Sequence, residues 1–288
     1  MGNAILWENL KATEFSEAVK KSKGVCVVPI GAMEKHGPHM PVGTDNIIAE
    51  RTAFLAAEKE PVVIFPTFRF GDVNTLQNFD GSICFSTKLL LDYFTELCRE
   101  IARSGFKKIL LLNAHGGNPP LLTTFCRSMR EKKNDFVVML ANSYGTSPQE
   151  MQKAFAERRE DFPYITDEDA EIVNKYIQAE RSKGHADFDE ILLVYESMPE
   201  TIDMSRMGDE DGEDTMRTKH LREFGIFSGA NFLADFPNSY CATCFPHINE
   251  RLAKAYTEIR ADYIAKIFKT VKEDTVLLEE NEKWNQSW

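Results

Sequence analysis

The chain has 288 residues, of which 43% are hydrophobic and 27% are charged, an ordinary balance for a soluble globular protein. Its net charge of −11 argues against nucleic acid or an anionic membrane as a partner, because both require a basic surface. The sequence has no run near the roughly 20 apolar residues of a membrane span and no visible secretion signal, so we expect a cytoplasmic protein.

Short apolar segments alternate with longer amphipathic segments over the first half of the chain. The apolar segments predict strands at residues 25–30, 61–65, 107–112 and 136–140. The amphipathic segments predict helices at residues 9–21, 46–60, 87–104 and 119–133, while 68–86 is expected to be an ordered loop. This alternation implies right-handed βαβ units and a mostly parallel sheet with helices on both faces.

The second half of the chain departs from this alternation. We predict mostly helical polar structure at 145–183, and then an apolar helix or strand that is opened by 184–190 and runs to Tyr195. A charged surface excursion at 200–223 and a glycine- and aromatic-rich stretch at 224–236 are expected to follow. The chain is expected to end with a long helix at 247–272 and a polar tail that could pack on a neighbouring subunit. No internal repeat or flexible linker is visible. We therefore expect one domain over residues 1–288, with a motif-bearing core at about 20–200 and a C-terminal helix and tail at about 247–288.

The cysteines are interpreted as reduced thiols of a cytosolic protein. Four of them lie in apolar periodic segments, where a cysteine packs as a small hydrophobic residue. Cys241 and Cys244 form a single CxxC pair, and only His247 lies close to it in the sequence. A structural zinc site would need a second ligand pair, so incidental thiols are the simpler interpretation.

Candidate metal ligands follow two of the predicted strands. Glu34, His36, His39 and Asp45 come after the strand at 25–30, and His115 follows the strand at 107–112 within Asn113-Ala-His-Gly-Gly-Asn118. The carboxyl ends of parallel strands share one edge of the sheet, which is where open α/β sheets bind ligands. Carboxylates and imidazoles together suit zinc, manganese or iron.

The number of ligands bears on the number of metal ions. One catalytic ion needs three protein ligands and an open position, whereas two ions need about five ligands, one of them a bridging carboxylate. The two loops supply two histidines and two carboxylates with His39 in reserve, so a pair of ions requires one more carboxylate. A glycine-rich phosphate loop is the rival interpretation of Asn113–Asn118, but that stretch lacks the lysine and the glycine spacing of such loops.

Four stretches of the sequence resemble the motifs of the creatininase family. Gly31–Pro41, with Thr44-Asp45 behind it, resembles the signature loop, and Asn113–Asn118 resembles the second motif. Phe79–Ile83 resembles the short loop between them, and His185-Ala-x-x-x-Glu190 resembles the third motif. The four motifs occur in the family's order over about residues 25–195.

This resemblance implies a single three-layer α/β/α domain, a homohexamer and a centre of two divalent ions, Zn²⁺, Mn²⁺ or Fe²⁺. Glu34 and His115 would bind one ion, His36 and Glu190 the other, and Asp45 would bridge them. His185 matches the histidine that protonates the leaving group. His39, Asn113, Gly116, Gly117 and Asn118 would support these ligands or contact the substrate. Helix capping is the competing role for both His185 and Glu190.

The sequence also departs from the family pattern. Asp187 and Ile191 replace a glycine and a threonine of the third motif, Gly184 replaces a glutamate near the creatinine site, and Gly117 stands where creatininase has a ligand glutamate. The implied activity is hydrolysis of a cyclic amide or another C–N bond in a small molecule by metal-activated water. The alternatives are a formamide deformylase, a peptidase of redox-cofactor maturation, a hydrolase of an oxidised inositol, and a metal-binding protein that has lost turnover.

Overall fold

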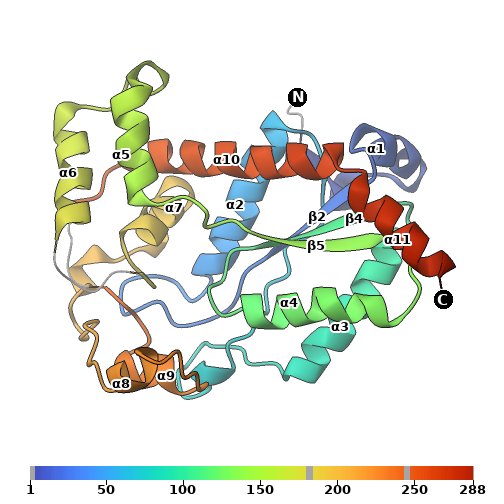
Figure 1. Cartoon of the computed structure of the whole chain (residues 1–288). Helices are drawn as coiled ribbons and strands as arrows, with labels where there is room; N and C mark the ends of the chain where they lie inside the picture. Colours follow the sequence, from blue (N-terminus) through green and yellow to red (C-terminus); the bar gives the residue numbers. More distant parts are fainter. Residues whose placement is uncertain (1–3, 180–183, 243–246, 288) are drawn as a thin grey trace.

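The computed structural model describes residues 4–179, 184–242 and 247–287 (Figure 1). Its centre is a sheet of five parallel strands in the order β1-β3-β2-β4-β5. The strands are β1 (Ile5–Leu6), β2 (Val25–Ile30), β3 (Val63–Ile64), β4 (Lys108–Asn113) and β5 (Val137–Asn142). The predicted parallel sheet is confirmed, and the short edge strand β1 is an addition to it.

Every residue of β2 is buried, so its alternate side chains meet two different layers of helices. Val25 and Val27 pack with α2 (Thr44–Lys59) and α10 (Glu250–Glu273). Cys26, Val28 and Ile30 pack on the other face with α3 (Thr87–Arg103) and α4 (Pro119–Ser128), and α1 (Phe15–Lys21) joins that layer. Figure 1 shows α2 and α10 on one side of the strands and α3 and α4 on the other, which is the expected α/β/α arrangement.

A further apolar cluster lies around α7 (Phe188–Ser197), which packs against α2 and α10. The helices α5 (Pro148–Glu157) and α6 (Asp167–Gln178) complete this cluster. The packing of α7 against α2 matters for the site, because each of these helices carries a candidate ligand in its first turn.

The C-terminal segment is a helix rather than the predicted tail. Helix α11 (Val276–Gln286) packs on the chain's own β5, and Asn281 Nδ2 donates to the carbonyls of Asn134 and Phe136 at 2.7 and 3.4 Å. Just before it, the buried Lys108 ammonium donates to carbonyls at the C-terminal end of α10, those of Val271, Lys272 and Asp274.

The charged segment at 200–223 is also more than a surface excursion. The N–H of Asp203 donates to the carbonyl of His39 at 2.9 Å, and Met207 is buried in the cluster around α7. Glu210 pairs with Lys35 at 2.6 Å. The segment, which contains α8 (Lys219–Arg222) and is followed by α9 (Asn231–Asp235), therefore packs back over the loop that follows β2.

None of the helices within the described ranges is both long enough and apolar enough to span a membrane.

Candidate metal centre

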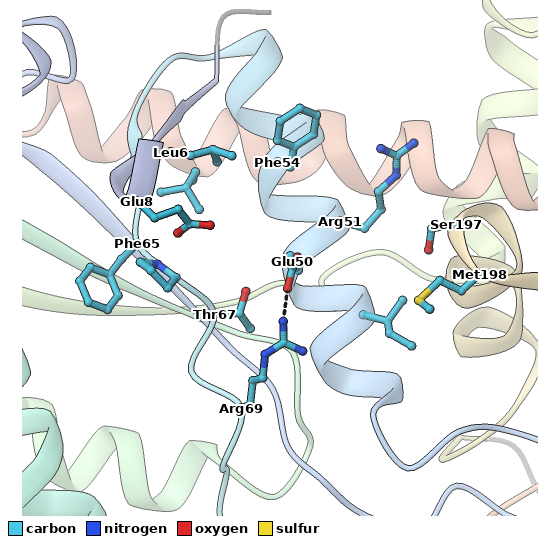
Figure 2. A pocket seen from close by; sticks show the side chains of 13 residues that line it. Leu6, Glu8, Glu50, Arg51, Phe54, Phe65, Thr67, Arg69, Ser197 and Met198 are labelled. Carbon is cyan, nitrogen blue, oxygen red and sulfur yellow. Dashed lines mark hydrogen bonds and ion pairs between the residues drawn. The ribbon is translucent and has the colours of Figure 1, made fainter. Parts of the chain in front are cut away.

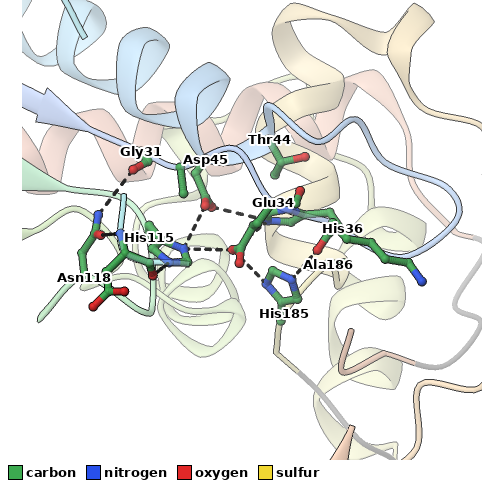
Figure 3. A network of polar contacts seen from close by, with 12 residues as sticks. Gly31, Glu34, His36, Thr44, Asp45, His115, Asn118, His185 and Ala186 are labelled. Carbon is green, nitrogen blue, oxygen red and sulfur yellow. Dashed lines mark hydrogen bonds and ion pairs between the residues drawn. The ribbon is translucent and has the colours of Figure 1, made fainter. Parts of the chain in front are cut away.

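The predicted ligands come from separate elements that converge on one point. Figure 3 shows four of them, Glu34, His36, Asp45 and His115. β2 and β4 are neighbours that end level with each other, so the loops carrying Glu34 and His36 and the loop carrying His115 lie side by side. Asp45 is in the first turn of α2 and Glu190 is in the first turn of α7. Helix α2 begins at Thr44, two residues earlier than predicted, and this places Asp45 on rigid structure.

The ligand atoms form two groups that share Asp45. Nδ1 of His115 lies 2.9 Å from Glu34 Oε1 and 3.0 Å from Asp45 Oδ2. Nε2 of His36 lies 3.4 Å from Asp45 Oδ1 and 3.7 Å from Glu190 Oε2. Within each group, Glu34–Asp45–His115 and His36–Asp45–Glu190, the ligand atoms lie within 4.8 Å of one another.

His185 belongs to a third group of this kind, with Glu34 and His36. Its Nδ1 is 3.8 Å from Glu34 Oε1, and its ring centre is 4.2 Å from that of His36. Its side chain is 17% exposed, whereas that of His36 is completely buried. His185 therefore stands at the solvent side of the cluster, close enough to serve either as a proton donor or as a ligand.

In each of His36, His115 and His185, the ring nitrogen that does not face the carboxylates lies close to a backbone carbonyl. Nδ1 of His36 lies 3.1 Å from the Glu34 carbonyl, Nε2 of His115 lies 3.0 Å from that of Asp72, and Nε2 of His185 lies 2.9 Å from that of Lys35. A carbonyl only accepts hydrogen bonds, so these nitrogens carry the N–H. In the neutral rings the opposite nitrogens are then unprotonated and directed at the carboxylates, which is how metal-binding histidines are oriented.

The buried polar atoms at the centre fit a cation. Glu34 Oε1, His36 Nε2 and Asp45 Oδ2 are buried, and none of them has a hydrogen-bond partner among the described residues. The short approach of His115 Nδ1 to two carboxylate oxygens is not a hydrogen bond in the tautomer above, since both sides present lone pairs. Buried lone pairs that face one another are costly unless a positive ion lies between them.

The carboxylates also create a strongly negative potential at this point. Burial lowers the pKa of His36, but Asp45, Glu190 and Glu34 outweigh it and raise that pKa to about 10. Burial raises the pKa of Glu190 to about 7, against the lowering effect of His36. Such a potential attracts divalent cations, and bound cations would replace protons at these groups.

The turn before α7 orients both His185 and Glu190. Ala186 has a φ of +61°, a left-handed conformation that is uncommon for a residue with a side chain. Its N–H donates to Glu190 Oε2 at 2.6 Å, and its carbonyl accepts the Nε2–H of His39 at 3.0 Å. His39 itself lies outside the three ligand groups.

The second motif holds the His115 loop in place. Asn113 Oδ1 accepts the N–H of His115 at 3.1 Å and a bond from Asn118 Nδ2 at 2.9 Å. A Cβ at Gly117 would lie 2.5 Å from His115 Nε2, so only glycine fits there. A Cβ at Gly116 would meet nothing within 4 Å, and that residue faces a pocket.

That pocket has a volume of about 650 Å³, and Glu34, His115 and His185 form part of its wall. Several other lining residues, among them Asp72, Phe227 and Phe232, were not predicted, because they lie in loops or in the five-residue helix α9, which is too short to show a helical period. The aromatic content of residues 224–236 was the available signal, and nothing in the sequence tied it to the site.

A second hollow of about 510 Å³ lies along α2, β1 and β3 (Figure 2). Its arginines are paired with carboxylates: Arg69 with Glu50 at 2.7 Å, and Arg51 with Glu196 at 2.6 Å. None of the metal-ligand groups found in the described part of the chain lies in it. The pocket beside the metal-ligand groups is therefore the better candidate for substrate binding.

Comparisons with known proteins identify the family of the chain. The sequence profile of the family Creatininase, described as creatinine amidohydrolase, matches residues 8–240. A mycofactocin precursor peptide peptidase of Mycobacterium tuberculosis is 33% identical over 119 residues, which are 38% of this chain and 47% of the relative. Creatinine amidohydrolase of Pseudomonas putida is 24% identical over 41% of this chain and 47% of the relative. The chain thus matches about half the length of these curated relatives.

Solved structures of creatininases share the fold. A creatininase with manganese superposes with a TM-score of 0.64 at 18% identity, over 94% of this chain and 100% of that chain. The crystal structure of a creatinine amidohydrolase gives the same TM-score of 0.64 and covers 99% of that chain. Because the family profile covers residues 8–240 and the fold agrees, the resemblance of the motifs is confirmed: the chain belongs to the creatininase family.

Proposed function

We propose that the protein is a metal-dependent hydrolase that cleaves a C–N bond of a small molecule, with two divalent ions held by Glu34, His36, Asp45, His115 and Glu190. The observation that carries this proposal is that two ligand groups share the Asp45 carboxylate, one oxygen toward each histidine. A shared carboxylate is the usual bridge of a two-metal site. The zinc and manganese forms of structurally similar creatininases support the choice of Zn²⁺ or Mn²⁺, with Fe²⁺ as a further candidate.

Two divalent ions bound here would lower the pKa of a water molecule and polarise a substrate carbonyl. The chain's own residues would hold these groups in place. The carbonyls of Glu34, Asp72 and Lys35 fix the histidine rings, so the unprotonated nitrogens need no reorganisation on binding an ion. Burial of Glu34 and Asp45 excludes competing water from the ligand side.

His185 is the proposed proton donor to the departing nitrogen. It lines the pocket and is the most exposed of the three histidines at the centre. Burial lowers its pKa, as does the neighbouring His36, which favours release of a proton over retention. The strained turn at Ala186 supports this role by keeping His185 and Glu190 on the same side of the centre.

The names of the relatives describe four substrates: creatinine, a peptide, a formylamino pyrimidine and an oxidised inositol. Cyclic-amide hydrolysis remains our first proposal. Deformylation, peptide cleavage and inositol-ring hydrolysis are the alternatives within the same family.

The test is hydrolysis by chelator-treated protein reloaded with Zn²⁺, Mn²⁺ or Fe²⁺, assayed on cyclic amides, formamides, short peptides and oxidised inositols. We expect turnover of at least one class only with metal, lost in Glu34→Gln and kept in His220→Ala, whose histidine is exposed on α8. Bound metal without turnover of any class would favour a metal-binding protein that has lost catalysis.

A further inference from the structure

The pocket beside the metal-ligand groups has an apolar wall that the proposed chemistry does not require. Val73 and Leu76 line it at and just before a short 3₁₀ turn at Asn74–Leu76, and Phe227 and Phe232 line it from a part of the chain distant in the sequence. Leu233, which follows Phe232 in α9, packs against Val73 and Leu76, so these parts of the lining are in contact. At about 650 Å³ the space is far larger than the attacked bond itself needs.

The aromatic side of this wall begins at the proposed proton donor. The ring of Phe232 meets His185 edge-on, with ring centres 5.9 Å apart. A group attached to the nitrogen that His185 faces would therefore lie against Phe232. Phe227 is 84% exposed although it lines the pocket, so a ligand could cover much of its apolar surface and gain the corresponding free energy.

The charges of the pocket disfavour an anionic group. Among the described lining residues the charged side chains are the carboxylates of Glu34 and Asp72, besides the histidines. Lys35 is next to Glu34 in the chain, but its ammonium pairs with Glu210 at 2.6 Å and lies 4.6 Å from the centre of the Phe79 ring. An anionic substituent would face Asp72 without an opposite charge from this lining.

We propose that this pocket selects substrates that carry an apolar, ring-sized group without a negative charge beside the attacked bond, and that Phe227, Phe232 and Asp72 determine this preference. The inference rests on the proposed metal-dependent function and adds a substrate class to it. It disfavours creatinine itself, which has no such group, and phosphorylated substrates.

Hydroxamates provide a test that does not depend on turnover, because they chelate active-site metal ions. Calorimetry on zinc-loaded protein would compare acetohydroxamate, benzohydroxamate and 4-carboxybenzohydroxamate. We expect benzohydroxamate to bind about tenfold or more tightly than acetohydroxamate, from burial of the ring. The carboxylated compound should lose most of this gain, and Asp72→Asn should restore part of it.

Phe224 supplies a matched control for Phe227. Both phenylalanines are highly exposed, at 81% and 84%, but Phe224 does not line the pocket. Phe227→Ala and Phe232→Ala should weaken benzohydroxamate severalfold and leave acetohydroxamate unchanged, whereas Phe224→Ala should change neither. Agreement of the acetohydroxamate affinities shows that each variant is folded and holds its metal.

The outcomes separate the two proposals. If no hydroxamate binds to metal-treated protein, the metal-dependent function fails and the inference fails with it. If the hydroxamates bind with equal affinity, or if the carboxylated compound binds most tightly, the metal centre stands and only the proposed substrate class is overturned.

Discussion

Asp45 directs a different carboxylate oxygen at each of two histidines, whereas Glu34, which is also shared by two groups, approaches its histidines through Oε1 alone. Oδ1 lies 3.4 Å from His36 Nε2, and Oδ2 lies 3.0 Å from His115 Nδ1. Both oxygens are held by the first turn of α2, which is fixed in turn by the Thr44 hydroxyl donating to the Pro41 carbonyl at 2.7 Å. A change at Asp45 should therefore affect both ions.

The variants Asp45→Ala and His36→Ala test this difference. Asp45→Ala should lose nearly all bound metal, whereas His36→Ala should keep about one ion per chain, because a bridging carboxylate serves two ions and a terminal imidazole serves one. Metal content after dialysis would be measured by elemental analysis. Equal losses in the two variants would remove Asp45 from the bridging role.

Substitution of His185 would show whether this residue is a proton donor or a metal ligand. His185→Ala should keep its metal content and lower turnover by about 10²–10⁴-fold, the usual effect of a lost general acid. The loss should be smaller for substrates whose leaving group needs no proton. Loss of an ion in this variant would make His185 a ligand with Glu34 and His36, and unchanged activity would leave it only a structural role.

Elements were predictable where a local pattern decides the structure. The residues of β2 and the bounds of α3 follow from apolar runs and helical periodicity. The family motifs led to the candidate ligands that the fold brings together. The edge strand β1 has two residues and forms only by pairing with β3, a contact distant in the sequence. Helix α11 buries Asn281 rather than a stripe of apolar residues, so hydrophobic periodicity did not predict this helix. The pocket wall around Phe232 likewise depends on tertiary contacts, here between the five-residue helix α9 and segments far from it in the sequence.

Helices α6 and α10 are joined by Asp169, which is buried at the start of α6. Its carboxylate accepts bonds from Arg251 at 2.7 and 2.8 Å and from Asn249 Nδ2 at 2.8 Å. Burial raises the pKa of Asp169, but Arg251, Thr166 and Asn249 outweigh it and hold that pKa below its usual value. The carboxylate therefore stabilises the fold above an unfolded-state pKa of about 4, and this contribution is lost as the pH falls through the folded-state pKa.

Asp169→Asn should lower the free energy of unfolding by about 1–3 kcal/mol near neutral pH, through weaker bonds to a charged partner. The difference from the unmodified chain should shrink below about pH 4. Urea unfolding near neutral pH and below about pH 4 would measure this difference in the free energy of unfolding. The control is Asp167→Asn, at an exposed aspartate of the same helix turn. A difference that is independent of pH would show that the charge of Asp169 does not contribute.

We propose that the chain forms a homo-oligomer, with a hexamer as the form that the family resemblance implies. Light scattering at micromolar concentration should give a mass several times the 32.8 kDa of one chain. A mass near that of one chain would contradict it.

Metal stoichiometry is the sharpest check on the proposed two-metal centre. Protein purified without chelator, or reloaded with Zn²⁺ or Mn²⁺ and dialysed, should carry about two divalent ions per chain by elemental analysis, since the ligand set is that of a two-metal site. A value near one would leave one ligand group without its proposed ion, and a value near zero after reloading would rule out a metal centre formed by these residues.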